Sequence, residues 1–188
     1  MAQAKTLTPA ELEQALQYIA QHSFARRNRV MLLLGMWSGM RVGEIASLSV
    51  GDVMNADKSV KAEIRLSADQ TKGRHPRTVF ISQKLRDELQ GYLDLRQPVK
   101  ITAPLFVTAG GKAFSANVLT QHFYWQFKKI GIDGATSHSM RRSFITNLAA
   151  KGIGVRVLAS LAGHRSIAVT QKYIDVNDDM KRNAVELV

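Results

Sequence analysis

The chain has 188 residues, 45% of them hydrophobic, which suits one folded domain with a core of its own. Its 26 Lys+Arg against 15 Asp+Glu give a formal net charge of +11, so we expect a polyanionic partner, nucleic acid ahead of an anionic membrane surface. The absence of cysteine excludes disulfides, thiolate metal sites and cysteine nucleophiles, and no apolar run reaches the roughly 18 residues that span a bilayer.

The first segment, MAQAKTLTPAELEQ, lacks the apolar core of a signal peptide, so a cytoplasmic or nucleoid-associated setting is the default. Thr8, Pro9 and Glu11 predict a capped helix start, and the apolar face that follows extends to about Gln21. The next segment, VMLLLGMW, is apolar nearly all round and predicts a buried central helix. The arginines that precede it (Arg26, Arg27, Arg29) indicate either a solvated helix end or a set of phosphate contacts.

Ser38-Gly39 breaks this helix, and Arg41 opens another with Glu44 three residues on. A charge between two apolar segments is costly unless it is paired or used. The structural interpretation is an Arg41–Glu44 ion pair within one helix. The functional interpretation is an arginine aimed at a phosphate and held by Glu44 behind it.

Residues 58–82 change period and predict a β-hairpin with Lys72 at or beside the turn, to which Val60 adds a possible third strand. Amphipathic helices follow at Lys84–Arg96 and from a cap at Ser115. The predicted fold class is α+β, mostly α-helical, with a small antiparallel three-stranded sheet or hairpin.

The segment from 138 to 175 carries the chemistry. His138 and Arg141 are three residues apart and so lie on one helix face, Gly163-His164 marks a break, and Tyr173 follows. Arginine offers a planar fork that fits phosphate oxygens, and a tyrosine becomes a nucleophile once its proton is removed and its target is neutralised. These groups together suit attack on a phosphate diester.

Five motifs occur in order: R-x-x-E in GMRVGEI, T-K-G before a strand, H-x-x-R in HSMRR, G-H-x-S in GHRS and T-x-x-Y in TQKY. Each is weak alone, but together they resemble the catalytic domain of the tyrosine recombinases, the phage integrase family, from about Leu7 to Asp175. The resemblance implies a site-specific DNA recombinase that cleaves and rejoins strands through a 3′-phosphotyrosine, with no cofactor and no metal. The residues it implies are Arg41, Lys72, His138, Arg141, His164 and Tyr173.

The resemblance also implies double-stranded DNA as partner, with a free monomer that forms a homotetramer on DNA. We expect residues 1–188 to be one catalytic domain without the N-terminal core-binding and arm-binding domains of longer members. The tail, residues 176–188, ends in apolar residues that need a groove, on this chain or on a neighbouring protomer.

Three alternatives remain open at this stage. A type IB topoisomerase-like relaxing enzyme would use nearly the same residues. A DNA-binding regulator would keep the fold without the chemistry, although it has no need of Tyr173 beside two imidazoles. A metal nuclease built on His138 and His164 lacks a plausible set of carboxylates.

Overall fold

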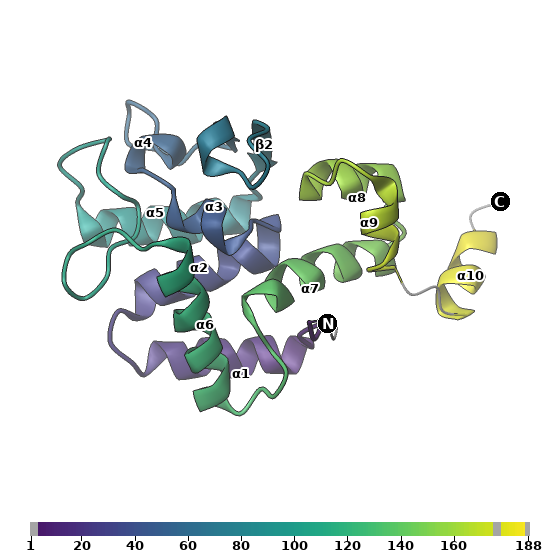
Figure 1. The fold of residues 1–188 in the computed structure, drawn as a ribbon. Helices are drawn as coiled ribbons and strands as arrows, with labels where there is room; N and C mark the ends of the chain where they lie inside the picture. Colours follow the sequence, from purple (N-terminus) through teal and green to yellow (C-terminus); the bar gives the residue numbers. More distant parts are fainter. Residues whose placement is uncertain (1–3, 175–177, 187–188) are drawn as a thin grey trace.

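The computed structural model describes residues 4–174 and 178–186, and in this part of the chain helices surround one small antiparallel sheet (Figure 1). The mostly helical α+β class predicted from the sequence is confirmed. In chain order the elements are α1 (Pro9–Ala20), α2 (Ala25–Ser38), α3 (Val42–Ala46), α4 (Val50–Val53), β1 (Glu63–Leu66), the 3₁₀ turn η1 (Ala68–Gln70), β2 (Arg77–Phe80), α5 (Gln83–Arg96), α6 (Ala116–Ile130), α7 (Ser137–Ala150), α8 (Val155–Ala162), α9 (Ile167–Gln171) and α10 (Asp178–Val185).

Two helix starts follow the expected caps. At α1 the Thr8 hydroxyl accepts from the Glu11 amide at 3.2 Å, and the Glu11 carboxylate accepts from the Thr8 amide at 2.9 Å. At α6 the Ser115 hydroxyl accepts from the Val118 amide at 3.2 Å. Each bond satisfies an amide that has no partner within its own helix, so short local patterns were enough to predict where these helices begin.

Helix α2 is the centre of the molecule, as its apolar sequence predicted. Its residues from Val30 to Leu34 are fully buried, and it packs against α1, α3, α5 and α7. Of the arginines at its start, Arg27 donates to the Val107 carbonyl at 2.6 Å and Arg29 pairs with Glu88 at 2.6 Å. These two therefore bind protein atoms and are not a solvated helix end.

The sheet is a two-stranded hairpin, in which Glu63 pairs with Phe80 and Leu66 with Arg77. The predicted third strand at Val60 is wrong, because that residue forms an isolated bridge with Met54. The amide of Lys61 donates to the Val53 carbonyl at 2.8 Å, which ties residues 60 and 61 to α4.

Helices α8 and α9 follow the long α7 and form a C-terminal lobe beside the main body (Figure 1). Helix α10 stands apart from that lobe, and its Val185 is 67% exposed. Part of the predicted docking tail, residues 176, 177, 187 and 188, lies outside the described residues. None of the described helices is long and apolar enough to cross a membrane.

Candidate active site

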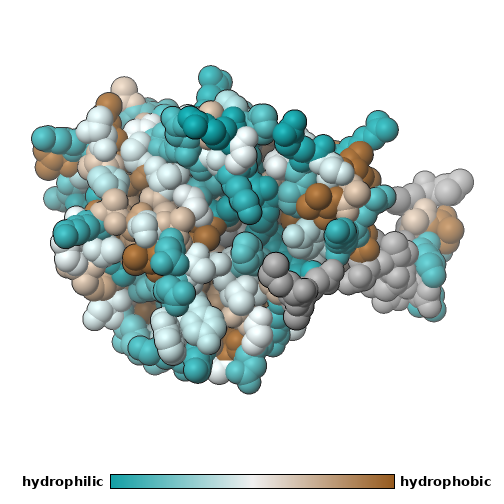
Figure 2. Space-filling view, viewed as in Figure 1, coloured by the Kyte–Doolittle hydropathy of each residue, from teal (hydrophilic) through white to brown (hydrophobic). Residues whose placement is uncertain are grey.

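A pocket of about 780 Å³ lies between the main body and the C-terminal lobe, and all six of the predicted site side chains line it. Figure 2 shows hydrophilic residues gathered on the face between the two parts. The six come from five parts of the chain: Arg41 precedes α3, Lys72 lies in the hairpin connection, His138 and Arg141 lie on α7, His164 joins α8 to α9, and Tyr173 follows α9.

Arg141 is buried, with 6% of its surface exposed, and is held between two helix ends. Its Nη1 donates to the carbonyl of Gly39 at 2.6 Å, and its Nη2 donates to the carbonyl of Ala162. Gly39 ends α2 in a left-handed conformation (φ +66°), and an added Cβ would lie 2.4 Å from the Phe144 ring, so this position requires glycine. The carbonyl ends of two helices carry partial negative charge, which offsets the burial of the cation.

Arg41 is held by Glu44, as the R-x-x-E spacing predicted. Its Nη1 donates to the Glu44 carboxylate at 3.0 Å, and its backbone amide donates to the same carboxylate at 2.7 Å. The Glu44 side chain is 1% exposed. Burial alone would raise its pKa, but hydrogen bonds from Arg77 and then Arg41 outweigh burial and hold the pKa below its usual value.

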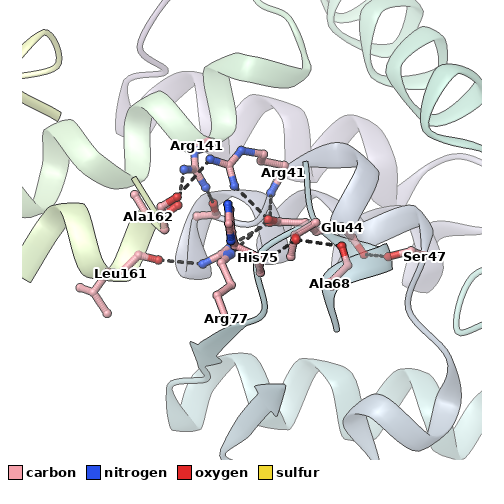
Figure 3. Close-up of polar contacts among 12 residues, drawn as sticks. Arg41, Glu44, Ser47, Ala68, His75, Arg77, Arg141, Leu161 and Ala162 are labelled. Carbon is pink, nitrogen blue, oxygen red and sulfur yellow. Dashed lines mark hydrogen bonds and ion pairs between the residues drawn. The ribbon is translucent and has the colours of Figure 1, made fainter. Parts of the chain in front are cut away.

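The end of α8 gathers the guanidinium groups. Its last carbonyl groups have no partner within the helix, and those of Leu161 and Ala162 point toward Arg77 and Arg141 (Figure 3). The carbonyls of Leu161, Ala162 and Gly163 accept in turn from Arg77 at 2.9 Å, from Arg141, and from Arg41 at 3.4 Å. One helix end thus fixes three cations that come from three distant parts of the chain.

His164 follows directly and is oriented by Thr170. Its Nδ1 lies 2.8 Å from the Thr170 hydroxyl, and Thr170 is fully buried. Burial and then the nearby guanidinium groups, Arg141 foremost, lower the pKa of His164 to about 4, so the ring is neutral at pH 7. Because Nδ1 is engaged, Nε2 is the nitrogen left for a ligand.

Tyr173 sits against the same group of residues. Its ring stacks on that of His164, with centroids 5.8 Å apart, and the Arg142 guanidinium lies 5.5 Å from its ring centroid. The Thr170 carbonyl accepts from the Tyr173 amide at 2.9 Å. Thr170 of the T-x-x-Y motif therefore orients both the His164 ring and the turn that carries Tyr173.

Lys72 and His138 reach the pocket from its rim. Both residues are exposed. Lys72 belongs to the connection between β1 and β2, where the neighbouring Thr71 hydroxyl donates to the His75 carbonyl at 2.7 Å. His138 lies in the first turn of α7, and its amide donates to the Thr136 hydroxyl at 3.2 Å.

The sequence interpretation missed Arg77 and Arg142. Arg142 lines the pocket, and its Nε donates to the Thr6 hydroxyl at 3.1 Å. Arg77 binds Glu44 at 2.7 Å with a side chain only 10% exposed. The alternation of residues along β2 indicated such a role for Arg77. It shares a strand face with the buried Val79, and an arginine on an inward-facing strand face requires a partner.

Within residues 4–174 and 178–186, no three His, Cys, Asp or Glu side chains gather as metal ligands would. His138 and His164 line the pocket with cations and not with carboxylates. The donor set of a metal nuclease is therefore not formed by the described residues.

The chain is similar to known proteins over most of its length. The family model described as "Phage integrase family" matches residues 5–180. The tyrosine recombinase XerA of Pyrococcus furiosus is 32% identical over 187 residues, which cover 97% of this chain and 61% of that protein. The chain thus spans about three fifths of the length of this relative.

Two solved structures share the fold. The Tn1549 transposon integrase in complex with a circular intermediate DNA superimposes with a TM-score of 0.81 at 21% identity, over 100% of this chain and 67% of that one. The catalytic domain of bacteriophage HP1 integrase gives a TM-score of 0.67 at 22% identity, over 91% of this chain and 87% of that one.

Proposed function

The chain belongs to the phage integrase family of tyrosine recombinases, and from that membership we propose that it cleaves and rejoins DNA strands at specific sites through a covalent 3′-phosphotyrosine. The observation that supports this most directly is that the predicted residues all line the same pocket: Arg41, Lys72, His138, Arg141, His164 and Tyr173. The substrate is double-stranded DNA, to which a chain of net charge +11 is attracted electrostatically.

In the first step the Tyr173 oxygen attacks a backbone phosphorus and forms a P–O bond. Negative charge then builds on the non-bridging oxygens, and Arg41 and Arg141 stabilise it from fixed positions. Neutral His164 donates from Nε2 to one of these oxygens when the Thr170 hydroxyl donates to Nδ1. Since these groups are already oriented by helix carbonyls and Glu44, little reorganisation is needed when the charge develops.

The two exposed residues, His138 and Lys72, accept and donate the protons of this step. His138 takes the proton of the Tyr173 hydroxyl, and Lys72 gives a proton to the leaving 5′ oxygen as its bond to phosphorus breaks. Lys72 suits this role because the hairpin connection delivers a flexible ammonium to the rim of the pocket. The product is a tyrosyl ester that retains the energy of the diester, so a second 5′-hydroxyl can reverse the chemistry on another strand.

The assembly follows from the same proposal. We infer a monomer in free solution and a homotetramer on DNA, with the apolar end of the tail docked on a neighbouring protomer. The exposed Val185 on α10 supports docking, since an exposed apolar side chain gains free energy when it is covered. A cytoplasmic, nucleoid-associated location is part of this proposal.

The test is a nicked suicide substrate that carries candidate sites, followed by a denaturing gel. The parent chain is expected to give a denaturant-resistant DNA adduct, and to give it equally in EDTA. Tyr173→Phe is expected to abolish the adduct, because the phenol oxygen is the only atom exchanged for the deoxyribose oxygen, while gel-shift binding is retained.

Tyr124→Phe is the matched control, since it removes a hydroxyl from an exposed tyrosine on α6. Its adduct yield should equal that of the parent. A Tyr173→Phe protein that still forms the adduct would exclude this residue as the nucleophile, and a parent chain that forms none on any substrate would overturn the proposed function.

A further inference from the structure

Arg77 is a further guanidinium beside the pocket, in addition to Arg41, Arg141 and Arg142, and the proposed reaction gives it no role. It is the first residue of β2 and does not belong to the lining of the pocket within the described residues. Its Nη2 and Nε donate to Glu44 at 2.7 and 3.1 Å, and its Nη1 donates to the Leu161 carbonyl at 2.9 Å. It therefore connects the hairpin, the start of α3 and the end of α8 (Figure 3).

The charges around Glu44 determine how strongly Arg41 can attract a phosphate. Glu44 is buried and ionised, and the same Oε1 atom accepts from both Arg41 and Arg77. One carboxylate between two guanidinium groups leaves a net charge of about +1 for the cluster at neutral pH. Without Arg77, the remaining Arg41–Glu44 pair would have no net charge, and Arg41 would attract a phosphate far less strongly.

The packing holds Arg77 tightly in this place. Gly163 adopts φ +62°, and a Cβ added there would lie 2.6 Å from Arg77 Cδ. The backbone just before His164 is thus in direct contact with the Arg77 side chain. A closely packed, 10% exposed arginine is a fixed source of charge and not a mobile surface cation.

We propose that Arg77 is a positioning residue that neutralises Glu44 and so keeps the charge of Arg41 available for the scissile DNA phosphate. The inference rests on the proposed function, because it concerns the same phosphate. Glu44 orients Arg41, but its negative charge offsets the positive charge of Arg41. Arg77 neutralises Glu44, so the positive charge of Arg41 is again available. Arg77 itself does not touch the substrate.

The experiment measures single-turnover adduct formation by the full chain at saturating suicide substrate. Arg77→Gln removes the cation, and Arg77→Gln combined with Glu44→Gln removes the carboxylate as well, while the glutamine oxygen can still accept from the Arg41 amide. Arg77→Lys keeps a positive charge beside Glu44. Arg74→Gln is the matched control, since Arg74 is in the same hairpin connection and its side chain is 81% exposed.

Arg77→Gln is expected to lower the rate about 10- to 100-fold, a loss of the size found when a side chain that orients a metal ligand is removed. The double variant and Arg77→Lys should both recover a large part of that loss, and Arg74→Gln should match the parent. A second substrate replaces the scissile phosphate by an uncharged methylphosphonate. There, Arg77→Gln should lose much less relative to the parent, because less charge must be stabilised.

The opposite pattern would show that Arg77 serves only to hold the fold. One such result is a rate loss from Arg77→Gln that is equal on both substrates. Another is a double variant that reacts no faster than Arg77→Gln although thermal melting shows both proteins to be folded. A parent-like Arg77→Gln would also overturn the inference. Each of these outcomes requires an active parent, whereas a parent without adduct contradicts the proposed function instead.

Discussion

Arg141 and Arg41 show two ways of holding a cation near the proposed phosphate site. In the described part of the chain Arg141 is bound by the carbonyls of Gly39 and Ala162, which carry partial charges and leave the guanidinium its full charge. Burial, then Arg41 and Arg77, lower the pKa of Arg141 to about 9, so it remains charged at neutral pH. Arg41 is bound by a full carboxylate, which is why a further cation beside Glu44 matters.

The neutral state of His164 predicts how the stability of the protein depends on pH. Its pKa is lowered to about 4 in the folded chain, whereas an unfolded histidine titrates near its ordinary value of about 6.5. As the pH falls through this window, the unfolded chain binds a proton that the folded chain excludes. The stability present above pH 6.5 is therefore lost progressively toward pH 4.

We expect His164→Asn to reduce this loss, with up to about one proton fewer taken up on unfolding between the two values. His122→Asn should do the same, since burial and then Arg27 lower the pKa of His122 to about 4 as well. The measurement is the free energy of unfolding by urea at a series of pH values. A slope unchanged in His164→Asn would contradict the lowered pKa.

At the scale of elements, the contact between α2 and α7 sets the position of Arg141. Gly35 lies at this contact, where an added Cβ would come within 2.8 Å of both Cβ and Sδ of Met140. The two helices approach so closely because residue 35 has no side chain. The same approach brings the end of α2, with the Gly39 carbonyl, to the Arg141 guanidinium.

Gly35→Ala is therefore expected to destabilise the protein by about 1–3 kcal/mol, as overpacking of a core usually does. For a chain of this length that lowers the melting temperature by about 2–4 °C per kcal/mol. Gly91→Ala in α5 is the control, because its Cβ would meet Arg26 at an ordinary 3.7 Å. That variant should stabilise by about 0.4–1 kcal/mol, since alanine restricts the unfolded chain.

Calorimetric melting of both variants checks this pair of signs. A Gly35→Ala protein as stable as the parent would mean that α7 can move away without cost, and that the α2–α7 distance does not fix Arg141.

At the scale of the whole molecule, the main body and the C-terminal lobe share the pocket, while α10 stands apart (Figure 1). Removal of the tail is therefore expected to affect the proposed assembly and not the chemistry. We expect a chain that ends at residue 177 to melt at the temperature of the parent and to remain a monomer without DNA. On DNA it should lose the proposed tetramer, because the apolar surface that we propose to dock on the neighbouring protomer is gone.

Light scattering of both chains, with and without a DNA site, is the measurement. Val185→Asp is a finer variant, since it charges an exposed apolar residue of α10, and it should weaken the assembly in the same direction. Unchanged assembly of the shortened chain on DNA would exclude docking in trans.

The sequence by itself determined what local patterns can encode. Thr8 and Ser115 mark helix starts, the apolar run marks α2, and the spacing of Arg41 and Glu44 puts them in contact. The five ordered motifs also identified the family, and their six side chains line one pocket. The role of these side chains in catalysis stays a prediction.

The tertiary structure decided the contacts between distant segments. Arg41 meets Gly163 across 122 residues of sequence, and Arg77 meets Leu161 across 84. No periodicity predicts such contacts, because they depend on how α2, α7 and the hairpin pack against the end of α8. A hydrogen bond within one helix turn follows from the chain geometry, whereas one between separate elements exists only after the core has fixed their distance.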